Sequence, residues 1–421
     1  MGLEARVAFV FRSNRARFKI EFSATVEIIA ANVPTVIDMT EALSQRRKVL
    51  IIGAGVVGLT TAVALAKRGI KATIIADKLL SKTTSVIAGA LWEWPPAVCG
   101  FHQNQVSLTR SKAWARHSYE VFDTLSADPQ TGVRMLTSLF FFLHRVEDCP
   151  ADLQKMNETR KNVREFTHSP TLIDENEINP DFGLKDAYGY VAPIIDTDRY
   201  LIWLSGEVLR GGVEIVHERI VGPLRSQEQR LMSRFGADFI VNCSGLGAKD
   251  LGDSSVYPLR GALIRIRNNG CLVPPITKAY CVSHNDSLPG QNMIYIIPRG
   301  EKFALLGGLA EPHEWNEQIG LDNYEPIRQI FKRCVRFLPR LEQAEVDLDC
   351  PVKVGLRPMR QENIRLERET GTRIIHNYGH GGSGVTFSWG CAEEVAALVE
   401  SQAVAAVFDR ARPIVKSAVN R

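Results

Sequence analysis

The stretch at residues 48–58, KVLIIGAGVVG, constrains the fold of this chain more than any other part of the sequence. A short apolar strand runs directly into a glycine-rich turn, residues 59–68 continue with a helix-like pattern, and a second strand at 70–76 ends at Asp77. This order of strand, glycine turn, helix, strand and acidic residue is typical of a dinucleotide-binding unit. The sequence therefore predicts an α/β protein with a bound dinucleotide. The alternative, a glycine-rich turn without such a ligand, stays open at this point.

The glycines of this turn have separate physical roles. Gly53 permits the tight turn, Gly55 lets the backbone approach a pyrophosphate, and Gly58 lets the helix pack closely on the strand. The helix N-terminus offers free N–H groups and a partial positive charge to the phosphates. Asp77 is placed to accept hydrogen bonds from a ribose. The motif does not distinguish FAD from a nicotinamide cofactor.

Composition excludes several classes of protein. A chain of 421 residues is long enough for two domains, and its net charge of +4 gives no reason to expect a nucleic-acid or membrane partner. No apolar run reaches the length of a membrane span. The eight cysteines form no CxxC pair and the nine histidines show no ligand spacing, so we expect reduced thiols, no metal and a cytoplasmic location.

Both ends of the chain lie outside these patterns. Residues 1–46 are rich in arginine and lack a secretory signal, so we expect a poorly ordered extension. Two alternatives are a transit peptide, which the acidic residues of this segment disfavour, and a start of translation at Met39. The last five residues carry no peroxisomal address, which also favours the cytoplasm.

A second glycine loop lies far along the chain. Gly381, Gly382 and Gly384 precede a helical pattern at about 385–404, so backbone N–H groups could face an anion there as well. A flavin needs such a place, because its reduced form carries negative charge that a helix N-terminus stabilises. An ordinary glycine-rich turn before a terminal helix is the alternative.

Further short blocks of sequence follow the glycine turn: TIIADK at 73–78, TTS at 83–85, LW at 91–92, DFIVNCSG at 238–245, YIIP at 295–298, GLRPMR at 355–360, IRLE at 364–367, HNYGHGG at 376–382 and WGC at 389–391. In these blocks and in their order, the chain from residue 48 to about 403 resembles the D-amino-acid oxidases. The resemblance implies noncovalent FAD, hydride transfer from the substrate α-carbon to flavin N5, and reoxidation by O2 to hydrogen peroxide. The imino acid would then hydrolyse to a 2-oxo acid and ammonia.

The predicted fold class is α/β, a Rossmann-like FAD-binding domain that is discontinuous in sequence and contains an inserted, mainly antiparallel substrate domain. The FAD-binding domain is expected at 47–97, 200–254 and 357–410, and the substrate-binding domain at 98–199 and 255–356. An extension at 1–46 and a tail at 411–421 lie outside both.

The resemblance assigns roles to individual residues. Arg357 matches the arginine that holds the substrate carboxylate, and a guanidinium fork is suited to that pairing. Tyr295 matches a tyrosine whose hydroxyl helps to bind the carboxylate, and Gly382 matches a glycine whose carbonyl accepts a hydrogen bond from the substrate amine. His380 is expected to be structural. The residues expected to contact FAD are Gly53, Gly55, Val56, Val57, Gly58, Asp77, Lys78, Thr84, Ser85, Gly89, Leu91, Ile220, Ser244, Gly381, Gly382, Ser383, Gly384 and Thr386.

Three pocket positions depart from the family pattern. Gln291 stands where many members carry a second tyrosine on a mobile lid, which puts substrate gating in doubt. Glu93 replaces a glutamine of animal members, and its carboxylate would either favour a cationic substrate or face solvent. Ser383 replaces a bulkier aromatic residue of some relatives, which predicts a roomier site.

Three functions stay open from the sequence. The leading one is FAD-dependent oxidation of D-amino acids, with the D-amino acid and O2 as the small-molecule partners, and the chain could also form a homodimer. The second is an oxidase of glycine, an N-methyl amino acid or another amino-acid-like amine. The third is a non-catalytic flavoprotein, or a binding or structural protein that kept the fold, which the joint presence of Arg357, Tyr295 and Gly382 disfavours.

Overall fold

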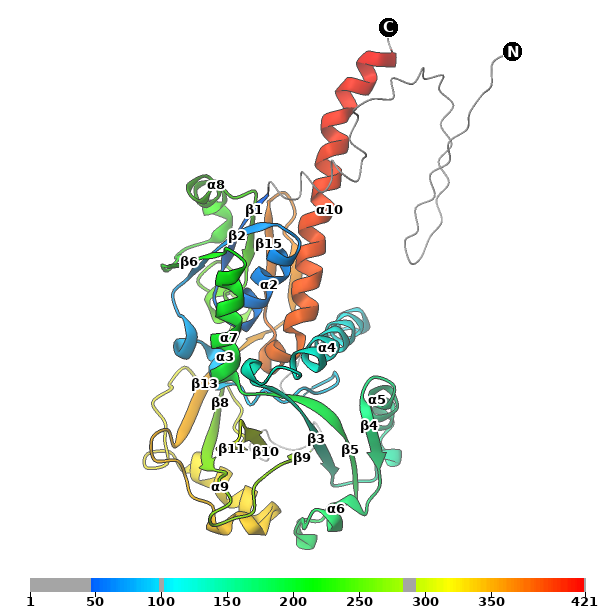
Figure 1. The fold of residues 1–421 in the computed structure, drawn as a ribbon, viewed down its shortest axis with the longest axis vertical. Helices are drawn as coiled ribbons and strands as arrows, with labels where there is room; N and C mark the ends of the chain where they lie inside the picture. Colours follow the sequence, from blue (N-terminus) through cyan, green and yellow to red (C-terminus); the bar gives the residue numbers. More distant parts are fainter. Residues whose placement is uncertain (1–46, 98–101, 283–292, 420–421) are drawn as a thin grey trace, which may run out of the picture. The chain divides into compact units, whose positions relative to one another are not determined.

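A computed structural model describes residues 47–97, 102–282 and 293–419, with side chains described as far as residue 401. These residues belong to one compact unit that contains two β-sheets (Figure 1). Gln291 lies outside the described residues. The domain boundaries stay a prediction.

The first sheet is assembled from three separate segments of the chain. Its strand order is β14 (Arg365–Arg368), β15 (Ile374–Tyr378), β7 (Phe239–Asn242), β1 (Lys48–Ile52), β2 (Lys71–Ala76) and β6 (Glu214–His217). All neighbours are parallel except β14 and β15. The predicted Rossmann-like sheet, discontinuous in sequence, is therefore confirmed.

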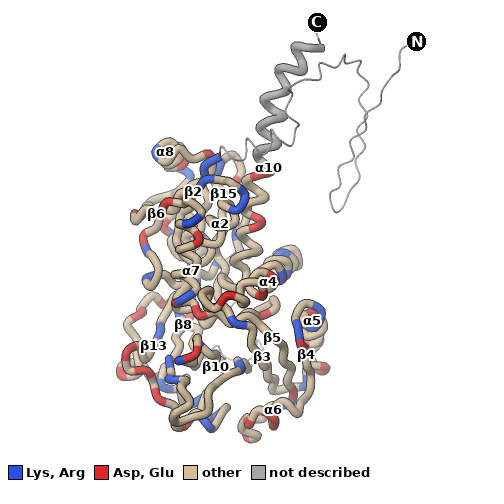
Figure 2. Tube along the Cα trace, in the orientation of Figure 1, with Lys and Arg blue, Asp and Glu red and all other residues tan. Residues whose placement is uncertain are grey.

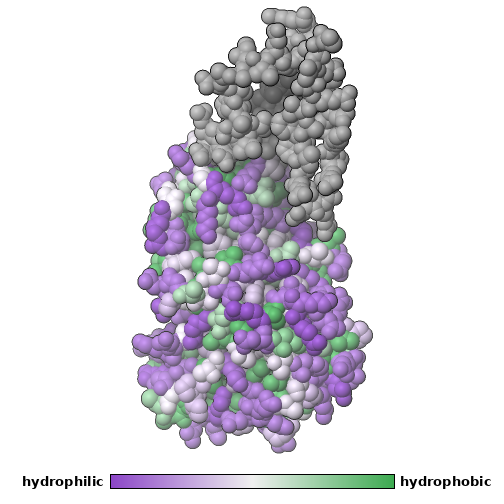
Figure 3. Space-filling model, turned by 45° about the vertical axis from the view of Figure 1, so that its right-hand side comes forward, coloured by the Kyte–Doolittle hydropathy of each residue, from purple (hydrophilic) through white to green (hydrophobic). Residues whose placement is uncertain are grey.

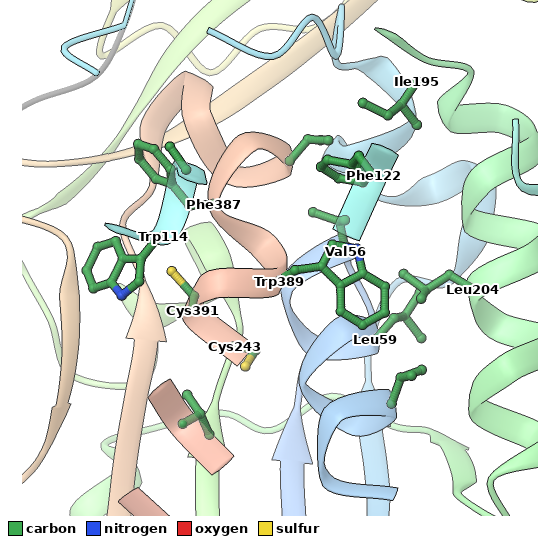
Figure 4. Packing of buried hydrophobic residues seen from close by; sticks show 14 of the residues in the cluster. Val56, Leu59, Trp114, Phe122, Ile195, Leu204, Cys243, Phe387, Trp389 and Cys391 are labelled. Atoms are coloured by element: carbon green, nitrogen blue, oxygen red, sulfur yellow. The ribbon is translucent and has the colours of Figure 1, made fainter. Parts of the chain in front are cut away.

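Alternate residues of β1 point to opposite faces of this sheet. Val49 and Ile51 pack into a large core with helices α2 (Val56–Lys67), α4 (Gln105–Leu125), α7 (Thr197–Arg210) and α10 (Gly384–Val419) (Figure 4). Leu50 and Ile52 pack on the other face against α8 (Leu224–Phe235). The α10 helix continues beyond residue 404, where the sequence pattern ended, to Val419.

The second sheet is mainly antiparallel, as predicted. Its order is β12 (Glu311–Pro312), β8 (Val256–Arg267), β11 (Phe303–Gly307), β10 (Ile294–Arg299), β9 (Ala279–Val282), β3 (Val133–Phe142), β5 (Asp186–Ile195) and β4 (Arg164–His168), with β13 (Val352–Arg360) also paired to β8. Only β3 and β9 run parallel among the pairs described. The α9 helix (Glu325–Phe337) buries Ile327, Ile330 and Cys334 against one face. Three shorter helices complete this part: α3 (Thr84–Ile87), α5 (Pro150–Arg160) and α6 (Leu172–Glu175).

A polar cluster joins the two sheets. The carboxylate of Asp253 accepts hydrogen bonds from Arg360 Nε at the end of β13 (2.9 Å) and from the Tyr378 hydroxyl at the end of β15 (2.8 Å). It also accepts bonds from the amide and hydroxyl of Ser255. Because β13 and β15 belong to different sheets, this one carboxylate fixes their ends relative to each other.

Charged residues of both signs are spread over the described part of the chain. Lys and Arg positions are interspersed with Asp and Glu positions along the Cα trace (Figure 2). On the face shown in Figure 3, hydrophilic side chains predominate and apolar ones are scattered. Among the described helices, none is both long and apolar enough to cross a membrane.

The Gly58→Ala substitution tests the close packing of α2. A methyl group there would lie 2.0 Å from the carbonyl oxygen of Gly53, so the helix must shift, and we expect a loss of about 2–3 kcal/mol in the free energy of unfolding. Gly206→Ala in α7 is the matched control, because its methyl group would find no atom closer than 3.5 Å. Alanine should be neutral or stabilise that helix by up to about 1 kcal/mol. Urea unfolding of both variants measures the difference, and equal effects would contradict the packing argument.

The Asp253→Asn substitution tests the joint between the sheets. Burial alone would raise the pKa of Asp253, but hydrogen bonds from Ser255, Tyr378 and Arg360 outweigh it and lower the pKa to about 2. A carboxyl group with a lower pKa in the folded state stabilises the fold above its unfolded pKa of roughly 4, and this contribution is lost as the pH falls toward 2. We expect Asp253→Asn to cost about 2 kcal/mol at pH 7, and the difference from wild type to shrink below pH 4.

Thermal unfolding between pH 7 and pH 3 measures this pH dependence. Asp250→Asn is the control, since the ion pair of Asp250 with Arg219 is largely exposed and such pairs contribute about 0–1 kcal/mol. A constant difference between Asp253→Asn and wild type across this range would show that the carboxylate charge is not the stabilising feature.

Candidate active site

One cavity of about 650 Å³ opens at the carboxyl ends of β1, β2 and β7 and extends over the second sheet. Its volume falls within the roughly 300–1,000 Å³ of small-molecule and cofactor sites. Open parallel sheets of this kind bind ligands at the switch point, where the chain leaves two neighbouring strands toward opposite faces of the sheet. In this sheet the switch point lies between β1 and β7. The cavity therefore lies where the sequence motif predicts a dinucleotide.

The glycine turn has the geometry that its sequence requires. Gly53 has a φ of 111°, and a methyl group on it would lie 2.4 Å from the carbonyl oxygen of Cys243 at the end of β7. Gly58 packs under the carbonyl of Gly53 and does not line the cavity, consistent with its predicted role in packing. The α2 helix begins after Gly55 with no side-chain cap and no acidic residue in its first turn, so its positive end faces the cavity.

Most of the other residues expected to contact FAD line the same cavity. Those that do are Gly53, Gly55, Val56, Val57, Asp77, Lys78, Thr84, Ser85, Gly89, Leu91, Ile220, Ser244, Gly381, Gly382, Gly384 and Thr386. The Val56 amide donates a hydrogen bond to the Ser85 hydroxyl (3.0 Å), which ties α3 to the start of α2. The Ser244 hydroxyl donates to Asn242 Oδ1 (2.6 Å).

The second glycine loop forms a short 3-10 turn, Gly381–Ser383, that leads into α10. Gly381, Gly382 and Gly384 line the cavity, and the first turn of α10 carries no acidic residue. The side chain of Ser383 points elsewhere: it is 2% exposed, does not line the cavity, and its hydroxyl has no hydrogen-bond partner among the described residues. A wider substrate pocket at Ser383 therefore gains no support from its position.

The second sheet turns alternate residues toward the cavity. Gly261 and Leu263 of β8, Tyr295 and Ile297 of β10, and Gly355 and Arg357 of β13 are each two residues apart, and all six line it. The glycines make room for the larger side chains. A methyl group on Gly261 would lie 2.4 Å from the Arg357 guanidinium, and one on Gly307 would lie 2.5 Å from the Tyr295 ring.

Arg357 has the chemistry of a carboxylate receptor. Its Nη1 donates to the carbonyl of Leu309 (3.0 Å), and it forms no ion pair with any carboxylate in the described part of the chain. Tyr295 projects from the same face of the sheet, and its hydroxyl donates to Met293 Sδ (3.2 Å). A partly buried guanidinium with no carboxylate partner in the described ranges, and with a phenol on the same wall, suits an anionic group of a ligand.

Glu93 lines the cavity but is not a lone charge. Its Oε1 accepts a hydrogen bond from Lys155 Nζ of α5 at 2.5 Å, and both side chains are nearly buried. The sequence offered two readings of Glu93, attraction of a cationic substrate or exposure to solvent. Neither considered this lysine, which lies 62 residues away.

Two cavity or near-cavity residues escaped the sequence analysis. Arg299 is buried and donates to the Thr197 hydroxyl and to the carbonyls of Ile195, Ala88 and Gly89, so it holds the Ala88–Gly89 loop in place. Asn377 lines the cavity and its Oδ1 has no partner among the described residues. The sequence signal for Arg299 was weak: a charged residue at the end of an otherwise apolar strand.

His380 lines the cavity as a neutral imidazole. Burial lowers the pKa of His380 to about 4, and its Nε2 lies 3.6 Å from the Cys391 sulfur. A group with this pKa is too weak a base to take a proton from an ammonium near pH 7. The position therefore agrees with the structural role expected for His380.

A possible metal-binding cluster lies outside the cavity. One potential ligand atom each from His144, Cys149 and Asp152 lies within 4.8 Å of the others. The sequence spacing did not indicate this cluster, and the absence of a metal stays a prediction. His144 Nε2 and Asp152 Oδ2 are hydrogen-bonded at 2.8 Å, which accounts for two of the three groups without an ion.

The residues present fit FAD. The N-termini of α2 and α10 both face this cavity, and neither helix has an acidic residue in its first turn. Each N-terminus can therefore stabilise negative charge, one that of a pyrophosphate and the other that of an electron-rich ring. Gly53 leaves the turn free of side chains, and Asn377 Oδ1, which has no hydrogen-bond partner within the described ranges, offers an acceptor. FAD would be held by the turn at Gly53–Gly55 at one end and by Gly381–Gly384 at the other.

Comparison with known proteins agrees with this geometry. Residues 48–398 match the family model described as FAD dependent oxidoreductase. D-amino-acid oxidase from Rubrobacter xylanophilus is 34% identical over 355 residues, which cover 83% of this chain and 95% of that protein. D-amino-acid oxidase from Streptomyces coelicolor is 35% identical over 363 residues, covering 83% and 96%.

Solved structures share the fold at lower identity. Glycine oxidase from Bacillus cereus superposes with a TM-score of 0.66 at 19% identity, covering 85% of this chain and 96% of that one. L-proline dehydrogenase from P. horikoshii superposes with a TM-score of 0.66 at 14% identity, covering 84% and 93%. From the matched sequence and the shared architecture together, the chain belongs to the D-amino-acid oxidase family of FAD-dependent oxidoreductases.

Proposed function

We propose that this protein oxidises D-amino acids to 2-oxo acids, ammonia and hydrogen peroxide, with FAD as its cofactor. The observation that carries the proposal is Arg357, a cavity-lining guanidinium without a carboxylate partner among the described residues, in the same cavity as the dinucleotide-binding turn. Relatives named D-amino-acid oxidase, at 34–35% identity over nearly their whole length, support it.

The chain's contribution to this reaction is mainly geometric. Arg357 would hold the substrate carboxylate through a two-pronged hydrogen bond, with the Tyr295 hydroxyl as a further donor. The carbonyl of Gly382 would accept a hydrogen bond from the substrate amine and so orient the α-carbon. Bound FAD supplies a hydride acceptor that O2 then reoxidises. No protein base is assigned, because positioning the α-hydrogen accounts for most of the rate.

A substrate panel tests the function directly. The purified protein should carry flavin absorption and release hydrogen peroxide with D-alanine or D-norleucine but not with the L-forms. Oxidation of glycine or sarcosine alone would favour the second reading of the sequence. Flavin binding without turnover of any amine would favour a non-catalytic flavoprotein.

The Arg357→Leu substitution tests the carboxylate receptor. Loss of one partner of a buried charged pair costs about 2–5 kcal/mol, so kcat/KM for D-alanine should fall at least about 30-fold, mainly through KM. Arg357→Lys keeps the charge but not the planar fork, so its kcat/KM should lie between those of the wild type and Arg357→Leu. Arg267→Leu, at an exposed position at the end of β8, is the control and should leave KM unchanged. A normal KM in an Arg357→Leu protein with full flavin content would show that Arg357 does not bind the substrate carboxylate.

We also propose a cytoplasmic location. The seven cysteines within the described residues are all unpaired, which suits a reducing compartment.

A further inference from the structure

The ion pair between Glu93 and Lys155 lies at the wall of the substrate cavity. Glu93 lines the cavity, and its Oε1 lies 2.5 Å from Lys155 Nζ of α5. The two side chains are 15% and 13% exposed, so water screens the pair only weakly. Lys155 does not line the cavity and acts on a ligand only through Glu93.

The pair lies beside a different part of the second sheet from Arg357, because Leu91, two residues before Glu93, pairs with Ile194 of β5, and β5 is several strands away from β13. The strands β13, β8, β11, β10 and β9 follow one another, with Arg357 on the first, Tyr295 on the fourth and Cys281 on the last. Tyr295 and Cys281 are cross-strand neighbours and both line the cavity. A substrate whose carboxylate is held at Arg357 and Tyr295 therefore has the wall at Cys281 and Glu93 left for its side chain.

The charges of Glu93 and Lys155 act on other side chains near the cavity wall at Cys281. Burial raises the pKa of the Cys281 thiol, the negative charge of Glu93 raises it further, and the positive charge of Lys155 opposes the rise. Burial and then the charge of Glu93 also raise the pKa of Tyr188 on β5, with Asp152 as a smaller contributor. A second ion pair involves α5: Lys112 of α4 lies 2.6 Å from Glu158 of α5, so these two charges also neutralise each other.

We propose that Lys155 is a positioning residue that sets the substrate class: by holding and neutralising Glu93, it makes the cavity favour neutral over cationic D-amino acid side chains. This inference rests on the proposed function. A cationic side chain loses its hydration on entering the cavity, and a carboxylate already paired with lysine offers little in return. Without the lysine, the carboxylate would be an unpaired buried charge that a substrate ammonium could satisfy.

The Lys155→Met substitution tests the proposal with two substrates of the same shape. The side chains of D-ornithine and D-norleucine have the same number of heavy atoms and differ in a terminal ammonium or methyl group. We expect the wild type to prefer D-norleucine. In Lys155→Met the ratio of kcat/KM for D-ornithine to that for D-norleucine should rise at least about 10-fold.

Matched variants separate charge from general damage to the fold. Lys155→Arg restores the positive charge and should restore the wild-type ratio. Adding Glu93→Gln to Lys155→Met removes the carboxylate and should abolish the gain. If Lys155→Met does not fold, Lys155→Gln keeps a hydrogen-bond donor for Glu93 without the charge and should show the same rise. An unchanged ratio in a folded, flavin-containing Lys155→Met or Lys155→Gln protein would overturn the proposal.

Binding of molecules that cannot be oxidised distinguishes this inference from the proposed function. The carboxylates 5-aminopentanoate and hexanoate correspond to D-ornithine and D-norleucine without the α-amino group, and their Kd can be followed by flavin absorption. In Lys155→Met the preference should move toward 5-aminopentanoate by a similar factor. If D-amino acids are not oxidised but this shift occurs, the function is wrong and the role of Lys155 stands. If D-norleucine is oxidised but the binding preference does not move toward 5-aminopentanoate, the proposed function stands and the role of Lys155 is wrong.

Discussion

The close backbone contact at the start of α2 decides where the other parts of the site can lie. Gly58 packs under the carbonyl of Gly53, and Gly53 packs under the carbonyl of Cys243, with no space for a side chain on either glycine. This contact brings the carboxyl ends of β1 and β7 and the N-terminus of α2 to one point. The core shared by α2 and α10 then brings the second helix N-terminus, at Gly384, to the same cavity.

Charge in the cavity follows a simple division. At the dinucleotide side, helix N-termini supply partial positive charge and their first turns hold no acidic side chain. On the second sheet, Arg357 is a full positive charge that the described carboxylates leave unpaired, whereas Glu93 is matched by Lys155. The described side chains therefore put an unpaired positive charge on one wall of the cavity and a neutralised ion pair on another.

Features encoded within a short stretch of sequence were predictable. The strand, turn and helix at residues 48–77 and the loop at 381–384 depend on the absence of a side chain at a few positions, and glycine records this directly. Arg299, Lys155 and Tyr378 were not predictable in their roles. They act on partners 211, 62 and 125 residues away, at Ala88, Glu93 and Asp253, and only the folded topology brings them together.

The same distinction explains why a shared fold does not determine a substrate. The fold is a property of the backbone, and it is shared with structures that are only 14–20% identical to this chain and whose names include a glycine oxidase and an L-proline dehydrogenase. The charge of the cavity wall depends on side chains from separate segments, such as Glu93 before β3 and Lys155 on α5. Because one substitution at either position changes the net charge of the wall, substrate preference can change while the fold and the cofactor site stay the same.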